Sequence, residues 1–221
     1  MRHKCVKFCP LFNIAVMLFS RFKVSNELNR IDFTKNDWFK FKLIANLQSS
    51  DKLKHMKDRM RGQFYEKKVK ELEKCLKTKL PGVLHLGRRI AVCIMEILQI
   101  PLEFIKELGM WNFDVFDEIY SSKLALQALK GISGFKKGPT SYFLNRNEFH
   151  EKTSLFILLW PELEGLLEAA LNGKNKTAAN FVHCLIELRR IIFQDLAYLK
   201  IIEQDHWLHY EYPFKTELFN E

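Results

Sequence analysis

The chain has 221 residues, 48% of them apolar and 28% charged, which suits one large domain or two small ones. Nine glycines and six prolines exclude a collagen or a low-complexity linker, and nineteen phenylalanines argue against a disordered chain, because so much apolar surface can offset ordering entropy. The net charge of +9 is concentrated in residues 1–80, where 20 Lys and Arg face 8 Asp and Glu, and such a basic half favours a polyanionic partner, nucleic acid first and an acidic membrane surface second.

The N-terminal part is predicted to be helical. Basic residues before the apolar run 10–19 are typical of a signal peptide, but no small-residue cleavage site follows. Pro10 suits a first helical position, so we expect a core helix over residues 10–23, ending near Ser25-Asn26. A short edge strand before Pro10 stays open. Asp37 is the expected cap of a second helix, over residues 38–47.

The middle of the chain begins with a long basic stretch, residues 51–79, which holds 11 Lys and Arg against 5 acids and ends at Pro81-Gly82. Three further helices are predicted between this stretch and a glycine-containing loop at residues 131–152. They are expected over residues 85–98, 102–108 and 114–129.

The last third is predicted to hold two helices, over residues 154–171 and 177–204, and an aromatic tail, residues 205–221, docked as a strap. We therefore expect a mainly α fold with at most a short N-terminal strand. The expected organisation is one domain over residues 1–221, with a core of about 2–172 and a C-terminal helix and tail of about 177–221.

Five scattered cysteines do not suggest a disulfide framework. Cys5 and Cys9 could begin a metal site, but no second Cys/His pair follows at finger-like spacing. Cys93 and Cys184 lie within apolar helical patterns and are interpreted as small buried side chains. We expect no metal, no cofactor, and a reducing intracellular compartment.

The most specific pattern is His85-Leu86-Gly87-Arg88, followed by Gly109-Met110-Trp111-Asn112 and then by Tyr120. His85 and Arg88 are three residues apart at a helix start, so they share a face. A guanidinium can bind a phosphate with two hydrogen bonds, and an imidazole can donate a third. With an indole donor and a phenol, the set can form a phosphodiester pocket in which the phenol attacks phosphorus.

Each member alone has an ordinary interpretation. His-x-x-Arg is common on solvated helix faces, Trp111 in an aromatic-rich chain is usually a core residue, and Tyr120 is usually a half-buried phenol. Only the ordered set favours the functional interpretation.

This set resembles the tyrosine recombinase superfamily, whose members carry His-x-x-Arg, then a His or Trp after a Gly, and a nucleophilic Tyr nine residues later, the spacing of Trp111 and Tyr120. The wider resemblance is to a fungal branch, comprising the DNA-binding domain of the largest subunit of the budding-yeast centromere-binding complex and Crypton-type transposon proteins. It covers most of residues 2–210 and is carried further by Arg2-His3-Lys4, Cys9-Pro10, Leu18-Phe19-Ser20-Arg21-Phe22, Trp38-Phe39-Lys40-Phe41-Lys42 and Leu159-Trp160-Pro161-Glu162-Leu163.

The resemblance implies a recombinase-like helical domain that wraps duplex DNA and contacts phosphates with basic segments. His85, Arg88, Trp111 and Tyr120 take the catalytic positions. The expected DNA contacts are Arg2, Lys4, Lys52, Lys54, Lys57, Arg59, Arg61, Lys67, Lys68, Lys70, His85, Arg88 and Arg89. The alternative for the basic stretch is a solvated amphipathic helix, and Trp160-Pro161 is expected to pack the C-terminal helices instead of touching DNA.

The chain also departs from the superfamily pattern. Active relatives use a further Arg and a Lys well upstream of His-x-x-Arg, but only 84 residues precede His85, and the equivalent Arg would fall before Met1, as in an N-terminally truncated domain. Lys4 is the one candidate for the Lys. A pocket without one clamping Arg loses much transition-state stabilisation, so we expect binding without strand cleavage.

The expected partner is double-stranded DNA in the nucleus, with no membrane and no small-molecule substrate, and a homodimer stays open. Two alternatives remain: an active recombinase or transposase in which Tyr120 forms a 3′-phosphotyrosyl link, and a helical interaction protein whose basic arm meets a protein or an acidic membrane.

Overall fold

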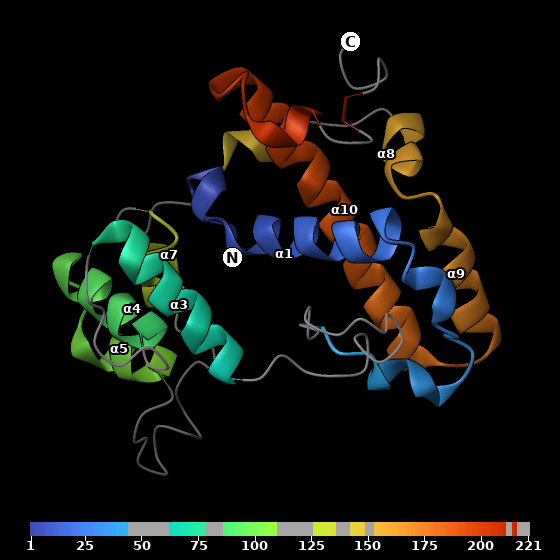
Figure 1. The fold of residues 1–221 in the computed structure, drawn as a ribbon, viewed down its shortest axis with the longest axis horizontal. Coiled ribbons are helices and arrows are strands. Elements are labelled where there is room, and N and C mark those ends of the chain that lie inside the picture. The colour runs from blue at the N-terminus through green and yellow to red at the C-terminus, as the bar shows by residue number, and fades with distance from the viewer. Residues whose placement is uncertain are drawn as a thin grey trace. The chain divides into compact units, whose positions relative to one another are not determined.

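The computed structural model describes residues 1–43, 62–77, 86–109, 126–135, 142–148, 153–210 and 214–215 (Figure 1). It is mainly helical, as predicted, and these described stretches contain no strand. The chain forms two compact units. The first consists of Met1, His3–Cys5 and Met60–Phe143, and the second of Arg2, Val6–Arg59 and Leu144–Glu221. No described helix is long and apolar enough to cross a membrane.

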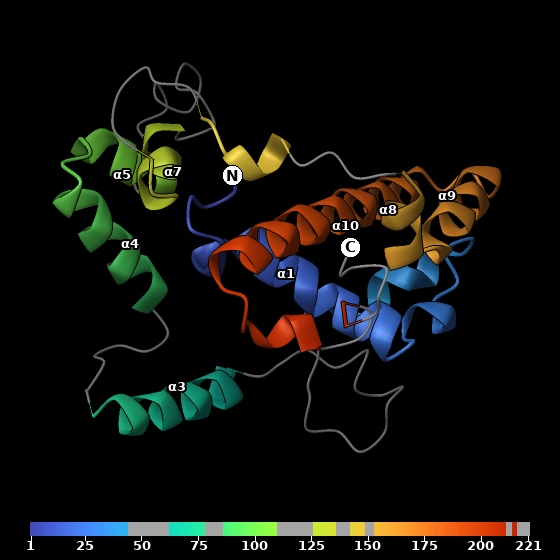
Figure 2. The ribbon, with the colours of Figure 1, turned by 90° about the horizontal axis from the view of Figure 1, so that it is seen from above.

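The second unit is built on α10 (Lys176–Ile202), against which α1 (Pro10–Phe19) and α9 (Glu162–Asn172) both pack (Figure 2). The predicted first helix is confirmed: Pro10 opens it and Asn26, at φ 57°, lies in the left-handed conformation that asparagine tolerates beyond a helix end. The side chain of Asn175 caps α10 by accepting from the Ala178 amide at 3.1 Å. Such a cap contributes about 1 kcal/mol.

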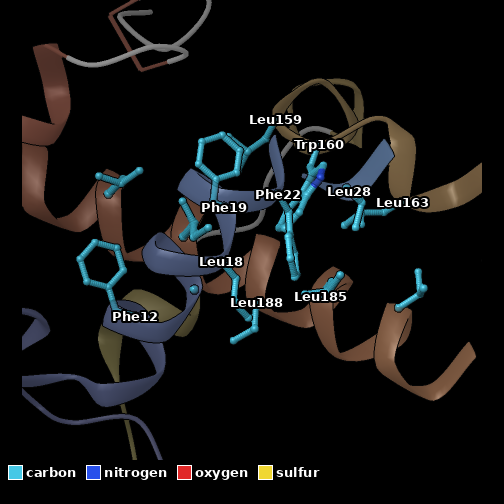
Figure 3. Close-up of a cluster of buried hydrophobic side chains, with 14 of the residues drawn as sticks. Phe12, Leu18, Phe19, Phe22, Leu28, Leu159, Trp160, Leu163, Leu185 and Leu188 are labelled. Carbon is cyan, nitrogen blue, oxygen red and sulfur yellow. The ribbon is translucent and has the colours of Figure 1, made fainter. Parts of the chain in front are cut away.

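The predicted helix over residues 154–171 is two helices, α8 (Thr153–Leu159) and α9, separated at Trp160-Pro161. Proline lacks the amide that would continue α8 and disfavours a helical conformation for the residue before it. Trp160 is fully buried, with its ring 5.6 Å from that of Phe19 and 6.4 Å from that of Phe22, and Figure 3 shows it within the hydrophobic cluster. Trp160 therefore packs in the core, in one cluster with the C-terminal helices as predicted and also with the N-terminal helical segment.

The tail contributes to the same core where the structure describes it. Leu208, in a 3₁₀ turn at Trp207–Tyr210, and Phe214 are both buried, and the Phe214 ring lies 5.8 Å from that of Phe19. This confirms the docked strap for these two side chains.

The predicted helix over residues 38–47 is wrong for its described part. Residues Asn36–Lys40 form a 3₁₀ turn, and Phe41 is already extended (φ −73°, ψ 125°). The reason is tertiary, because the Arg21 guanidinium donates to the carbonyl oxygens of Lys42 (2.9 Å) and Leu43 (2.5 Å), which a helix would need for its own hydrogen bonds. Residues 44–50 lie outside the described part.

The first unit contains α3 (Gly62–Leu76), α4 (Leu86–Ile97), α5 (Leu102–Gly109) and α7 (Leu126–Ile132). The helices predicted over 85–98 and 102–108 are confirmed, and α4, α5 and α7 share a small core around Met95, Ile100, Ile105 and Ala128. Residues 51–61 of the basic stretch and 110–125 of the third predicted helix lie outside the described part.

No edge strand precedes α1 in the described chain. The Lys4 amide makes one backbone hydrogen bond, to the Ser133 carbonyl at 2.7 Å, and Val6–Phe8 form a 3₁₀ turn.

Two of the cysteine predictions are corrected, because Cys93 and Cys184 are exposed, on the outer faces of α4 and α10, whereas Cys9 is fully buried. Within the described residues, no group of three His, Cys, Asp or Glu side chains is placed to bind a metal.

Candidate nucleic-acid interface

The residues of the predicted phosphodiester pocket are only partly described. Arg88 and its neighbour Arg89 are exposed near the start of α4. His85, Trp111 and Tyr120 lie outside the described residues, so their convergence with Arg88 stays a prediction.

The position of the two arginines is electrostatically informative. The N-terminal end of a helix carries the positive end of its dipole, which disfavours cations there and favours anions. Arg88 and Arg89 occupy the third and fourth positions of α4, and no acidic residue lies in its first turn. The helix dipole at this end of α4 therefore favours an anion over a cation.

A lysine row runs along one face of α3. Lys67, Lys70 and Lys74 are spaced three and four residues apart, so the row repeats about every 5 Å along the axis. All three are exposed, and Val69, on the opposite side of the helix, is buried. We call Lys67, Lys70 and Lys74 the lysine row.

The lysine row is not neutralised by its described surroundings. No described carboxylate forms a salt bridge with Lys67, Lys70 or Lys74, whereas Lys68 pairs with Glu71 at 2.7 Å. The hydrogen bond from Lys68, followed by the electrostatic effect of Lys67 and Lys74, holds the pKa of Glu71 below its usual value. Glu71 thus forms its described ion pair with Lys68, while Glu66 and Glu71 lie beside the lysine row without pairing with it in the described structure.

The sequence prediction included Lys67, Lys68 and Lys70 but not Lys74. The i, i+3, i+7 spacing was the signal that identifies Lys74 and that separates Lys68 from the row. The other predicted contacts in this stretch, Lys52, Lys54, Lys57, Arg59 and Arg61, lie outside the described residues. Lys4 is exposed.

The predicted DNA contact of Arg2 is corrected, because this side chain is buried in the second unit. Its side chain donates to Gln194 Oε1 at 2.6 Å and to Asn147 Oδ1 at 2.5 Å, and it pairs with Asp195, which is fully buried. Arg146 pairs with the same carboxylate at 2.5 Å. Arg2 therefore ties the N-terminus to α10 and cannot reach DNA without leaving this network.

A second buried arginine was missed by the sequence interpretation. Arg189, on α10, donates to the Trp160 carbonyl at 2.8 Å, pairs with Glu164 and lies over the Phe156 ring at 4.2 Å. No local pattern distinguishes Arg189 from the exposed Arg190 beside it, apart from its place among the apolar positions of the helix.

Comparison with known proteins gives one match. The family model described as centromere DNA-binding protein complex CBF3 subunit, domain 2, matches residues 1–220. Searches of curated proteins and of solved structures returned no match. Since the matched region spans both compact units, the chain belongs to the family of domain 2 of the CBF3 centromere DNA-binding complex subunit.

Proposed function

We propose that this chain binds duplex DNA through its basic segments, does not cut the strands, and acts in the nucleus as part of a centromere DNA-binding complex. The observation that carries the proposal is the lysine row of α3, three exposed lysines without a described salt bridge, in a chain whose family is described by centromere DNA binding.

The lysine row suits the backbone of DNA more than its bases. Ammonium groups neutralise phosphates and release condensed counterions, so binding weakens as salt rises, by a slope of about −0.9 for each contact. Such contacts position a protein on DNA and read little sequence. The expected activity is salt-sensitive binding with broad sequence tolerance.

A vestigial phosphate pocket at the start of α4 is the second part of the proposal. Arg88 would hold a phosphate there, together with His85, Trp111 and Tyr120, as the resemblance to tyrosine recombinases implies. The helix dipole supports an anion at this end of α4. Without the further clamping Arg of active relatives, the pocket binds a phosphate but gives little stabilisation to the transition state of cleavage.

Duplex binding is tested by titrating a fluorescent duplex of arbitrary sequence with the full chain and with the Lys67→Gln/Lys70→Gln/Lys74→Gln variant. We expect this variant to weaken binding about tenfold or more and to reduce the salt slope by about 2 to 3. The control is Lys176→Gln/Lys200→Gln/Lys215→Gln, which removes the same charge from exposed positions elsewhere. Equal losses in both variants would show that net charge, not the lysine row, determines binding.

Strand cleavage is tested with a nicked duplex that traps a covalent phosphotyrosyl intermediate. We expect no trapped product with the wild-type chain, and the same DNA affinity for Tyr120→Phe. A covalent adduct that disappears in Tyr120→Phe would contradict the inert pocket and show an active recombinase.

A further inference from the structure

The second unit carries an aromatic groove whose described lining contains none of the proposed DNA contacts. It has a volume of about 290 Å³ and lies between the start of α10 and the segment that follows α1. Its described lining is apolar except for one lysine: Phe22, Ile31, Phe33, Trp38, Phe39, Phe41, Lys42, Leu43 and Phe181.

The groove is held in shape by two sets of contacts. The Trp38 ring stacks on that of Phe181 at 5.2 Å, and Phe33 stacks on the other side of the same cluster, 6.2 Å from Phe181. The opposite wall, residues 41–43, is fixed by Arg21, which donates to the backbone of Lys42 and Leu43 while Glu27 holds its guanidinium at 2.7 Å. A site fixed before binding costs little ordering entropy when a ligand enters.

The groove exposes apolar surface that the described part of the chain leaves uncovered. Phe39 is 61% exposed and Leu43 48% exposed, although both belong to its lining. Contiguous apolar surface of this kind marks a binding site more often than a solvated face.

The charges around the groove indicate the chemistry of the occupant. Lys42 is the one charged side chain of the described lining. The rim therefore favours an acidic ligand.

The lining also discriminates between a peptide and a nucleobase. Apart from Lys42 and the Trp38 indole N–H, the side chains of the described lining have no hydrogen-bonding group, so the polar edges of a base would find few partners among them. A leucine or phenylalanine side chain loses no hydrogen bond on entering. The volume, near the lower end of ligand sites, suits one or two such side chains.

We infer that this groove is a docking site for an acidic peptide segment of a partner protein, whose large apolar side chain inserts between Phe39 and Trp38 while a flanking carboxylate pairs with Lys42. The inference adds a protein contact to the DNA contacts of α3 and does not depend on them.

The test uses a fluorescent nine-residue peptide with Phe-Leu at its centre and Asp or Glu on both sides, titrated with the full chain. Two further peptides serve as comparisons, one with Ala-Ala at the centre and one with Lys in every flanking position. We expect saturable binding of the first peptide, and binding at least about tenfold weaker for the other two.

Variants locate the site. Phe39→Glu should abolish peptide binding. Lys42→Glu should weaken it about fivefold, because the substituted carboxylate repels the acidic peptide. The backbone carbonyl of residue 42 still accepts from Arg21, so the wall of the groove is retained. The matched control is Phe8→Glu, an equally apolar side chain that is 71% exposed elsewhere on this unit and should leave peptide binding unchanged.

Three results would overturn the inference: no binding of the acidic peptide, equal binding to Phe39→Glu, or a loss of DNA binding on Phe39→Glu as large as that of the α3 triple variant. One explanation of the first result is that the chain itself covers the groove. In that case Phe39→Glu would also lower the melting temperature of the protein. DNA binding by wild-type protein is measured in parallel, so failure of the groove and failure of DNA binding are distinguishable.

Discussion

Arg189 donates a hydrogen bond to the carbonyl oxygen of Trp160 at 2.8 Å, and both residues are almost fully buried. The bond adds a second, shorter hydrogen bond to a carbonyl that accepts from the Leu163 amide at 3.4 Å, at the break between α8 and α9. The break between α8 and α9 and the position of the Trp160 ring in the core are therefore maintained by a side chain from α10.

Replacement of Arg189 by methionine should destabilise the protein by about 2 to 4 kcal/mol, because the buried Trp160 carbonyl would keep only the long hydrogen bond from the Leu163 amide, at 3.4 Å. Urea unfolding measures the change. Arg190→Met is the control, because that side chain is exposed and pairs only at the surface with Glu187, and it should change stability by less than about 0.5 kcal/mol. Equal effects of the two substitutions would contradict the structural role of Arg189.

Arg2→Gln should lower stability and leave DNA affinity unchanged. Its guanidinium is buried against Asp195 and Gln194, so we expect a loss of about 2 to 3 kcal/mol in urea unfolding. DNA affinity, measured where the variant remains folded, should stay within about twofold of wild type. A drop in affinity without a drop in stability would return Arg2 to the DNA-contacting set.

Asp32 should titrate with a pKa of about 2, below its reference value of 3.8. The main cause is a hydrogen bond from the Thr34 hydroxyl, at 2.5 Å, followed by the interaction with Lys35. A lowered folded pKa means that the contribution of Asp32 to stability is present above pH 3.8 and disappears as the pH falls through about 2. Carboxyl NMR titration of Thr34→Ala should show the pKa rising towards 3.8, and an unchanged pKa would disprove the assignment.

Lys68 and Lys70, two residues apart on α3, should contribute differently to DNA binding. Lys70→Gln should weaken DNA binding about threefold and reduce the salt slope by about 1, whereas Lys68→Gln should have a smaller effect, because Lys68 already pairs with Glu71. Anisotropy titrations at two salt concentrations measure both. Equal effects would mean that DNA separates Lys68 from Glu71 or that the lysine row is not the contact surface.

The sequence predicted what depends on local patterns. Helices opened by proline, such as α1, followed from residue spacing, as did the mainly α fold. The prediction of a helix after Asp37 was wrong, because Arg21 donates hydrogen bonds to the carbonyl oxygens of Lys42 and Leu43. Arg21 is remote along the chain, and no local sequence pattern encodes these bonds.

The same distinction applies to charge. The sequence identified the basic half of the chain, but not which cations have partners within the fold. Arg2 was expected at DNA and is paired with Asp195, and Lys68 is paired with Glu71, whereas Lys74 was missed. The charge of the sequence predicts the class of ligand. The ion pairs of the folded chain are needed to tell which cationic side chains are available to bind that ligand.

The most direct test of duplex binding is the slope of log Kobs against log salt for the wild-type chain on two duplexes of unrelated sequence. We expect tight binding in dilute buffer, a steep negative slope of about −3 or beyond, and nearly equal affinities for the two duplexes. Absence of binding at low salt, or an affinity that does not change with salt, would contradict DNA binding through the lysine row.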